Sequence, residues 1–246
     1  MPRFAAEAGN MVVEAHAKIN WTLEVLGVRA DGYHDLRSIV LPIPLHDTVS
    51  IEDAAELSCA MEGMPQERNL AYMAASALRE ATGCTRGARI VIEKRIPSGA
   101  GLGGGSADAA AVLNGLNAMW GLGLSERELC AIAARVGSDV PALLLGGPVL
   151  MEGRGERVRR IVRGSGGDAL PSPEDIVVFS PGIFASTAAV YREFREGDRG
   201  LGPNDLQPAA IRLYPGIADA LCRLEGEGLT RVTMSGSGSA VYGVAG

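Results

Sequence analysis

The sequence predicts an α+β fold, and two observations carry this prediction. Early segments alternate apolar and polar residues, which is typical of strands, whereas apolar residues further along the chain recur at helical spacing. Strand and helix patterns then follow one another without an internal repeat. The chain has 246 residues, 47% of them hydrophobic, which is enough for one large domain or two small lobes.

The first strands are expected in four alternating stretches, at residues 11–19, 22–27, 37–43 and 47–53. Asp31-Gly32 offers the positive φ that a tight turn between two such strands requires, and a loop of three or more residues is equally compatible. A further strand is expected at 88–96.

Three helices in the first half have recognisable ends. The first has Asn69 as N-cap and Gly83 as its stop. The second is expected from Ser106 to residue 119. The third begins at the capping box formed by Ser125 and Glu128, and it closes at Gly137.

The composition breaks at residues 146–148, which predicts two lobes, 1–148 and 149–246. The second lobe is expected to contain helices and strands in alternation, together with a mobile surface loop at 164–173. Its strands are expected at 156–162, 175–179, 231–235 and 240–244, and its helices at 186–194 and 217–225.

Charge and cysteine usage restrict the possible partners. The formal net charge is −6, so the chain has no overall basic field for nucleic acid or an anionic membrane, and no nucleic acid or membrane partner is expected. The four cysteines are too scattered for a zinc cluster or a redox pair, which favours reduced thiols. The first ten residues lack an apolar signal stretch, and no transit peptide is visible. A cytoplasmic location and a monomer or weak homodimer are expected.

The most informative stretch is PSGAGLGGGS, residues 97–106. Glycine tolerates positive φ and has no Cβ, so successive backbone amides can curve around an anion at the start of a helix. A flexible hinge is the alternative. No lysine follows the glycines, which excludes a P-loop, and the acidic residue of a dinucleotide-binding fingerprint is missing.

Several residues also have ordinary structural interpretations. Asp108 is expected to be an acid that stabilises the start of a helix. Lys18 in an alternating strand is typical of a solvated face. Asp139 before Val140-Pro141 is typical of an N-cap. His34 beside the turn could be merely solvated, and Tyr191 could belong to the core.

Two other stretches, AHAKIN at 15–20 and TMSGSGSAVYG at 233–243, accompany the glycine loop in the same chain. With these three motifs the sequence resembles the GHMP kinase superfamily, whose P-x-x-x-G-L-G-x-[GS]-S motif holds ATP phosphates. The resemblance covers residues 12–246. It implies a two-lobed fold, with a mixed α/β N-terminal lobe and a ferredoxin-like C-terminal lobe. The ATP-binding positions that it implies are Pro97, Gly99, Gly101, Leu102, Gly103, Gly104, Gly105 and Ser106.

The stretches AKINWTLEVLGVRADGYHDLRSIV, GSDVPALL and GRGE are similar to the branch that phosphorylates a cytidylyl-linked sugar alcohol in non-mevalonate isoprenoid synthesis. This resemblance implies that Lys18 and Asp139 form a catalytic pair and that the partner is a small cytidylyl substrate. Asp139 would take the proton of the acceptor hydroxyl late or orient that hydroxyl, because a carboxylate is far less basic than an alkoxide. The substrate-binding positions that it implies are Asn20, Tyr33, His34, Thr187, Tyr191, Gly236 and Ser237.

ATP chemistry also implies Mg²⁺, with Ser106 as the one residue named as a ligand. Relatives usually continue past the late glycine motif through a further helix and strand, so the second lobe is expected to be short at its end. A homoserine- or mevalonate-type GHMP kinase and a nucleotide-binding protein without turnover remain as alternatives.

Overall fold

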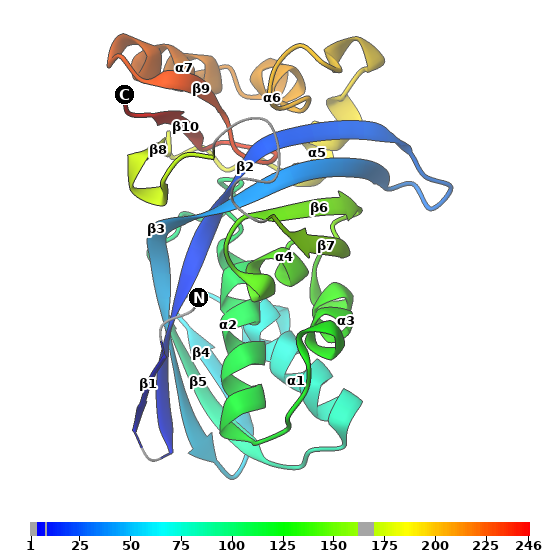
Figure 1. Ribbon diagram of the computed structural model, residues 1–246, viewed down its shortest axis with the longest axis vertical. Helices are drawn as coiled ribbons and strands as arrows, with labels where there is room; N and C mark the ends of the chain where they lie inside the picture. The colour runs from blue at the N-terminus through cyan, green and yellow to red at the C-terminus, as the bar shows by residue number, and fades with distance from the viewer. Residues whose placement is uncertain (1–3, 8, 162–169) are drawn as a thin grey trace. The chain divides into compact units, whose positions relative to one another are not determined.

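The computed structural model describes residues 4–7, 9–161 and 170–246. It contains two compact units, each built from separate stretches of chain (Figure 1). Unit 1 comprises Met1–Ala17, Leu45–Ile96 and Gly104–Gly147, and unit 2 comprises Lys18–Pro44, Pro97–Gly103 and Pro148–Gly246. The lobes predicted from the sequence are two continuous stretches, 1–148 and 149–246. Their boundary is one residue away from Gly147, where the last stretch of unit 1 ends. The units differ from those lobes because two early segments pack with the C-terminal part.

The strands of the first half are longer than the alternation predicts. They are β1 (Phe4–Glu7), β2 (Asn10–Val28), β3 (His34–Ala54), β4 (Leu57–Met61) and β5 (Gly87–Glu93). The breaks predicted inside β2 and β3 were wrong, and β1 and β4 were not predicted. Residues 17–21 of β2 are all buried, so the alternation disappears there while the strand continues.

Unit 1 holds one part of the sheet. In it β2 pairs antiparallel with β1, the second half of β3 pairs antiparallel with β5, and β5 pairs parallel with β4. Its helices are α1 (Leu70–Thr82), α2 (Gly104–Met119), α3 (Glu126–Val136) and α4 (Val140–Leu145). The helices lie on one face of these strands (Figure 1).

The predicted helix ends of α1 and α3 are confirmed. The Asn69 side chain accepts a hydrogen bond from the amide of Ala71, and Gly83 ends α1 with φ of 67°. Ser125 and Glu128 form both hydrogen bonds of the capping box of α3. The predicted start of α2, at Ser106, was wrong by two residues. It begins at Gly104, so Ser106 is its third residue and not its N-cap.

Helix α2 approaches the sheet closely at Gly115. A Cβ at this position would lie 2.6 Å from Cδ1 of Ile51 in β3 and 3.4 Å from the sulfur of Met11 in β2. Real Cβ atoms do not approach so closely, so this packing requires glycine. The contacts also show that α2 covers the face of the sheet on which Met11 and Val13 lie.

Unit 2 contains the other part of the first sheet and a second, separate sheet of three strands. The first half of β3 pairs antiparallel with β6 (Val149–Gly153), which pairs with β7 (Arg157–Arg160). The strands β8 (Ile176–Phe179), β9 (Thr230–Met234) and β10 (Val241–Val244) form an antiparallel sheet in the order β8-β10-β9. The helices are α5 (Thr187–Glu193), α6 (Gln207–Leu213) and α7 (Gly216–Gly226). Strand β6 and helix α6 were not predicted, and the predicted positions 162 and 164–169 lie outside the described residues.

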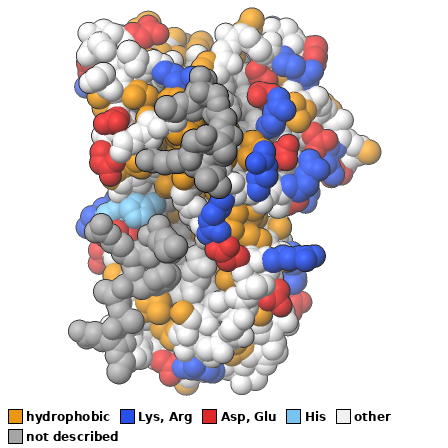
Figure 2. All heavy atoms as spheres, viewed as in Figure 1, with side chains coloured by type: hydrophobic (Ala, Val, Ile, Leu, Met, Phe, Trp, Pro, Cys, Tyr) orange, Lys and Arg blue, Asp and Glu red, His pale blue; other side chains and the backbone are white. Residues whose placement is uncertain are grey.

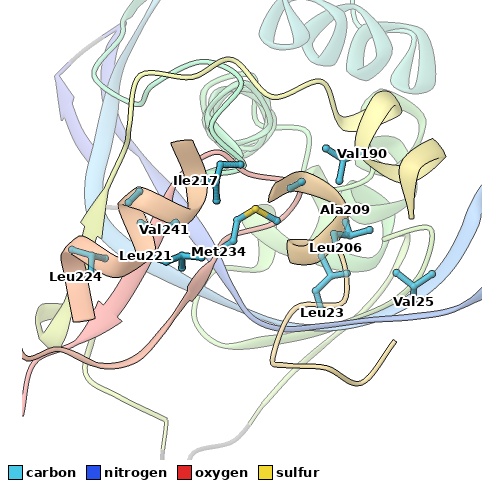
Figure 3. Packing of buried hydrophobic residues seen from close by; sticks show 12 residues of the cluster. Leu23, Val25, Val190, Leu206, Ala209, Ile217, Leu221, Leu224, Met234 and Val241 are labelled. Carbon is cyan, nitrogen blue, oxygen red and sulfur yellow. The ribbon is translucent and has the colours of Figure 1, made fainter. Parts of the chain in front are cut away.

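The core of unit 2 explains why an early segment belongs to it. Leu23 and Val25 of β2 pack in one cluster with residues of α5, α6, α7, β9 and β10 (Figure 3). Leu206, Ile217 and Met234 are fully buried there. Burial of this kind is the main favourable contribution to folding, so the second half of β2 is held by the C-terminal part of the chain.

Charges of both signs are mixed on the visible surface, in agreement with the absence of a basic field in the sequence (Figure 2). The arginines of β7 are exposed. Among the described residues, the helices are too short or too polar to cross a bilayer.

Candidate active site

The glycine loop, residues 97–103, belongs to unit 2 and has an unusual backbone. Gly99, Gly101 and Gly103 have φ of 66°, 76° and 70°, a region that other residues rarely adopt. A Cβ on Gly101 would lie 2.2 Å from the carbonyl oxygen of Ser235, and one on Gly99 would lie 2.3 Å from Cδ2 of Phe184. The loop therefore requires glycine at Gly101, where the contact is with backbone, whereas at Gly99 the positive φ favours glycine and the exposed Phe184 side chain can move.

The carbonyl groups of this loop are used within unit 2. The oxygens of Gly99, Ala100 and Leu102 accept hydrogen bonds from the amides of Ala185, Ala240 and Lys18.

The Gly101 oxygen accepts from the Lys18 ammonium and the Ser235 hydroxyl. Among the described residues, no acceptor pairs with the amides of Gly101, Leu102 or Gly103. Backbone amides without a protein acceptor are the donors that an anion-binding loop uses.

The loop leads directly into α2. Gly104, Gly105 and Ser106 form the first turn of this 16-residue helix, in unit 1. The first amides of a helix have no intrahelical acceptor, and the helix dipole adds positive potential there. A phosphate group suits such a position.

Lys18 is buried, with 3% of its surface exposed, so its interpretation as a solvated residue was wrong. Its ammonium donates to Oδ1 of Asn20 at 2.6 Å and to the oxygen of Gly101 at 2.8 Å. The Asn20 amide group donates in turn to the Ser38 hydroxyl at 2.7 Å. A buried ammonium needs such partners, and here they hold the lysine against the glycine loop.

The late glycine motif, residues 235–239, is buried in unit 2. A Cβ on Gly236 would lie 3.2 Å from Oδ1 of Asn20 and 3.3 Å from Nζ of Lys18. The hydroxyls of Ser237 and Thr187 are 2.8 Å apart. Unit 2 thus brings together the glycine loop, Lys18 and Asn20 with the late motif.

Aromatic rings gather at the start of β3, also in unit 2. The rings of His34 and Tyr191 have centroids 4.9 Å apart, and the Phe194 ring meets His34 edge-on at 6.2 Å. The Arg154 guanidinium lies 4.8 Å from the centre of the Tyr33 ring. Burial lowers the pKa of His34, which favours its neutral form. A neutral imidazole can both donate and accept, as recognition of a base edge requires.

Asp139 lies in unit 1, at the N-cap position of α4. Its φ and ψ are −86° and −14°, and its side chain makes no capping hydrogen bond. The expected N-cap position is confirmed, but the carboxylate does not perform the usual capping role. Because Lys18 and Asp139 lie in different units, their pairing stays a prediction.

Asp108 was wrongly interpreted as an acid of the first helical turn. It lies deeper in α2, almost fully buried, and Oδ2 accepts a hydrogen bond from the Lys94 ammonium at 2.8 Å. Lys94 also donates to Asp47. Burial raises the pKa of Asp108 to about 7, although the neighbouring Lys94 opposes this shift. The ion pairs of Lys94 lie next to the first turn of α2, because Nζ of Lys94 would be 3.2 Å from a Cβ on Gly104.

Comparison with protein families decides the identity of the fold. Residues 69–147 match the model of the GHMP kinases N terminal domain, and residues 186–246 match that of the GHMP kinases C terminal domain. Together the matches cover more than half of the chain. The chain belongs to the GHMP kinase family. This family consists of ATP-dependent small-molecule kinases, and the chain is an enzyme of this kind.

Similar GHMP kinases include the 4-diphosphocytidyl-2-C-methyl-D-erythritol kinase of Symbiobacterium thermophilum. It is 42% identical over 95% of this chain and 90% of its own length. A crystal structure of 4-(cytidine 5'-diphospho)-2C-methyl-D-erythritol kinase aligns with a TM-score of 0.80 at 39% identity, covering 96% of this chain and 90% of the other. A homoserine kinase from Cytophaga hutchinsonii aligns with a TM-score of 0.68 at 16% identity, covering 99% and 87%, and shows the shared fold alone.

Sequence reasoning missed two residues that support the GHMP kinase motifs, Ser38 and Asn204. The Ser235 hydroxyl lies 3.3 Å from the amide of Asn20, and Ser38 accepts from the Asn20 side chain. Asn204 donates to the carbonyls of Met234 and Gly236, at 2.8 Å each. Ser235 follows directly from the glycine-rich pattern, whereas nothing near Asn204 or Ser38 in the sequence signals their role.

Proposed function

We propose that this GHMP kinase transfers the γ-phosphoryl group of ATP to a hydroxyl of 4-diphosphocytidyl-2-C-methyl-D-erythritol, giving the 2-phosphate. The single observation that carries this proposal is the contact between the tilted rings of His34 and Tyr191, whose centroids are 4.9 Å apart, in the unit that also contains the glycine loop and Lys18. The names of the relatives agree with it.

ATP is the phosphoryl donor in this proposal. The amides of Gly101, Leu102 and Gly103 have no acceptor among the described residues, and the bare glycine backbone leaves room for close approach of phosphate oxygens. Gly104, Gly105 and Ser106 offer the first helical amides of α2. Pro97 is exposed where the loop begins, so its assigned role is to fix the loop backbone.

The cytidylyl group is assigned to the aromatic rings at the start of β3. Tyr33 is 56% exposed and His34 is half-buried, so both present surface to a ligand. An aromatic ring can stack on a nucleobase while an imidazole bonds to its edge. Arg154 beside Tyr33 carries positive charge that suits a diphosphate group. Thr187, Gly236 and Ser237 are assigned to the remainder of the substrate.

The catalytic pair is assigned to Lys18 and Asp139. Asp139 orients the acceptor hydroxyl and accepts its proton late, because a carboxylate is far less basic than an alkoxide. Lys18, held by Asn20 and the Gly101 carbonyl, offsets negative charge on the phosphoryl group being transferred. Positioning and electrostatic stabilisation contribute most in reactions of this class.

Mg²⁺ is proposed as the accompanying ion. It commonly keeps several waters and takes few protein ligands, and the Ser106 hydroxyl in the first turn of α2 is an oxygen donor of the appropriate type. When bound, the ion neutralises charge on the phosphate oxygens. We propose a cytoplasmic enzyme, since all four cysteines are free thiols, and a monomer or weak homodimer.

The proposal is tested by measuring ADP release from purified protein with Mg-ATP and one candidate alcohol at a time. Turnover is expected with 4-diphosphocytidyl-2-C-methyl-D-erythritol and not with homoserine or mevalonate. The product should carry the new phosphate on the 2-hydroxyl, which phosphorus and carbon NMR of the product would establish.

Three other outcomes would each contradict one part of the proposal. Turnover with homoserine or mevalonate would assign the chain to another GHMP kinase type. ATP binding without ADP release from any alcohol would identify a nucleotide-binding protein. Omitting Mg²⁺ should abolish turnover, and full activity in a chelator would refute its role.

Substituting Tyr191→Ala is expected to raise the KM for the cytidylyl substrate with little change in the KM for ATP. Stacking of an aromatic ring on a base contributes about 1–3 kcal/mol, which corresponds to a rise of roughly 5- to 150-fold. Steady-state kinetics with each substrate varied in turn measures both constants.

Tyr191→Phe is the matched control, because it keeps the ring and removes only the hydroxyl. Its KM values are expected to stay close to those of the parent chain. Tyr191 also packs against the core of unit 2, so the melting temperature of each variant should be recorded. Equal losses for both substrates in Tyr191→Ala would indicate a packing role instead.

A further inference from the structure

Three potential metal ligands meet in unit 1, away from the motifs described above. Glu14 and His16 lie on β2, and His46 lies on β3. All three side chains are partly buried, and one ligand atom from each lies within 4.8 Å of the others. Nε2 of His16 is 3.3 Å from Oε2 of Glu14, and Nε2 of His46 is 4.0 Å from Oε1.

These residues lie on the sheet face opposite the helices. Side chains alternate along a strand, so Glu14 and His16 point away from the face of Val13, which packs near Gly115 of α2. On β3, Asp47 bonds to Lys94 on the helix side, and its neighbour His46 points the other way. The cluster is therefore formed by two strands that present three partly buried ligand groups on the face opposite the helices.

Two of the spacings, to the two different oxygens of Glu14, are close to those of a metal coordination shell. Zinc ligands lie about 2.0–2.1 Å from the ion, so two ligands of a tetrahedral site are about 3.3 Å apart. The pair of His16 and Glu14 already has this separation, and the pair of His46 and Glu14 is less than an ångström wider. The two imidazole rings are tilted by 59° with centroids 5.2 Å apart, so their nitrogens can converge without stacking.

We propose that Glu14, His16 and His46 bind a divalent transition metal ion of the zinc class, with the fourth coordination position open to water. Two imidazole nitrogens and one carboxylate oxygen form a donor set that suits Zn²⁺ and Co²⁺ and does not suit Mg²⁺, which prefers oxygen ligands. An ordinary ion pair between Glu14 and a protonated histidine is the competing explanation, and it requires no metal.

The site has a structural consequence for unit 1. A metal bound at these residues joins β2 to β3, and it binds only when both strands are in their native places. Binding to the folded state alone stabilises that state by mass action, so the melting temperature of the chain rises with metal concentration.

Co²⁺ titration of the full chain, without nucleotide, tests the proposal. Co²⁺ takes zinc sites and reports its ligands by absorption, and Zn²⁺ is then added to displace it. We expect a spectrum of nitrogen and oxygen ligands, complete displacement by Zn²⁺, and no displacement by excess Mg²⁺. His16→Gln and His46→Gln should each weaken Co²⁺ binding by roughly tenfold or more, because even loss of a group that only supports a ligand costs 10- to 100-fold.

His34→Gln is the matched control, because it removes the remaining histidine of the chain and leaves the cluster intact. Its Co²⁺ affinity should equal that of the parent. The four free cysteines are the other candidate ligands, and a thiolate-to-cobalt charge-transfer band would reveal them. Such a band, an unchanged affinity in His16→Gln, or an equal loss in His34→Gln would overturn the proposal. Because the readout needs neither ATP nor turnover, the result is independent of the proposed kinase reaction.

Discussion

Substituting Asp139→Asn is expected to lower kcat by about 10²- to 10⁴-fold, the usual contribution of a positioned acid or base, while the affinity for ATP stays unchanged. The amide of asparagine has nearly the shape of the carboxylate but cannot accept the proton of the acceptor hydroxyl. Single-turnover phosphoryl transfer and equilibrium binding of ATP measure the two effects separately.

Stability provides a second readout for this variant. Asp139 occupies the N-cap position of α4, and asparagine is as favourable there as aspartate, so its replacement should change the melting temperature little. Ser138→Ala, at the exposed neighbouring position, is the control for local disturbance. A large fall in stability with turnover preserved would mean that Asp139 serves the helix and not the reaction.

Substituting Gly101→Ala is expected to abolish ATP binding and turnover together. The φ of 76° costs a residue with a Cβ about 1–2 kcal/mol. The added Cβ would also lie 2.2 Å from the Ser235 oxygen and 3.0 Å from that of Gly238, so the backbone must move. Movement breaks the hydrogen bonds that the Gly101 carbonyl accepts from Lys18 and Ser235, which disorders both the glycine loop and the Lys18 side chain.

Gly123→Ala separates backbone strain from the effect on the site. Gly123 has a similar φ of 66°, but a Cβ there meets nothing within 4 Å. Gly123→Ala should lose only the stability that the positive φ costs, and Gly101→Ala should lose more because of its clash with the Ser235 carbonyl, as measured by denaturant unfolding. ATP affinity, measured by calorimetry, should fall only in Gly101→Ala. Normal ATP binding in that variant would refute the assignment of the loop as the phosphate site.

Local sequence signals predicted the features whose cause lies within a few residues. Asn69 and Gly83 delimit α1, and the capping box of Ser125 and Glu128 begins α3, because each bond joins neighbours in the chain. The glycine loop was also visible, since positive φ is a property of the residue itself. Three motifs in order along the chain were enough to recognise the GHMP kinase family, which the comparisons confirmed.

Strand ends and buried charges were not predictable in this way. The alternation between apolar and polar residues vanished in β2 where residues 17–21 are buried together, so one long strand was interpreted as two. Lys18 resembles a solvated residue until its partners are known, and one of them, Gly101, is 83 residues away. Asp108 was misinterpreted for the same reason, because Lys94 and the burial that raises its pKa come from the folded chain.

By itself, the sequence determined the ends of α1 and the start of α3, the glycine backbone and the family, because these depend on the conformational preferences of single residues and on short spacings. The tertiary structure alone decided which segments pack into each unit, that Lys18 is buried against the glycine loop, and that Glu14, His16 and His46 meet. Burial and long-range hydrogen bonds join residues that are tens to hundreds of positions apart, and such separations leave no local pattern in the chain.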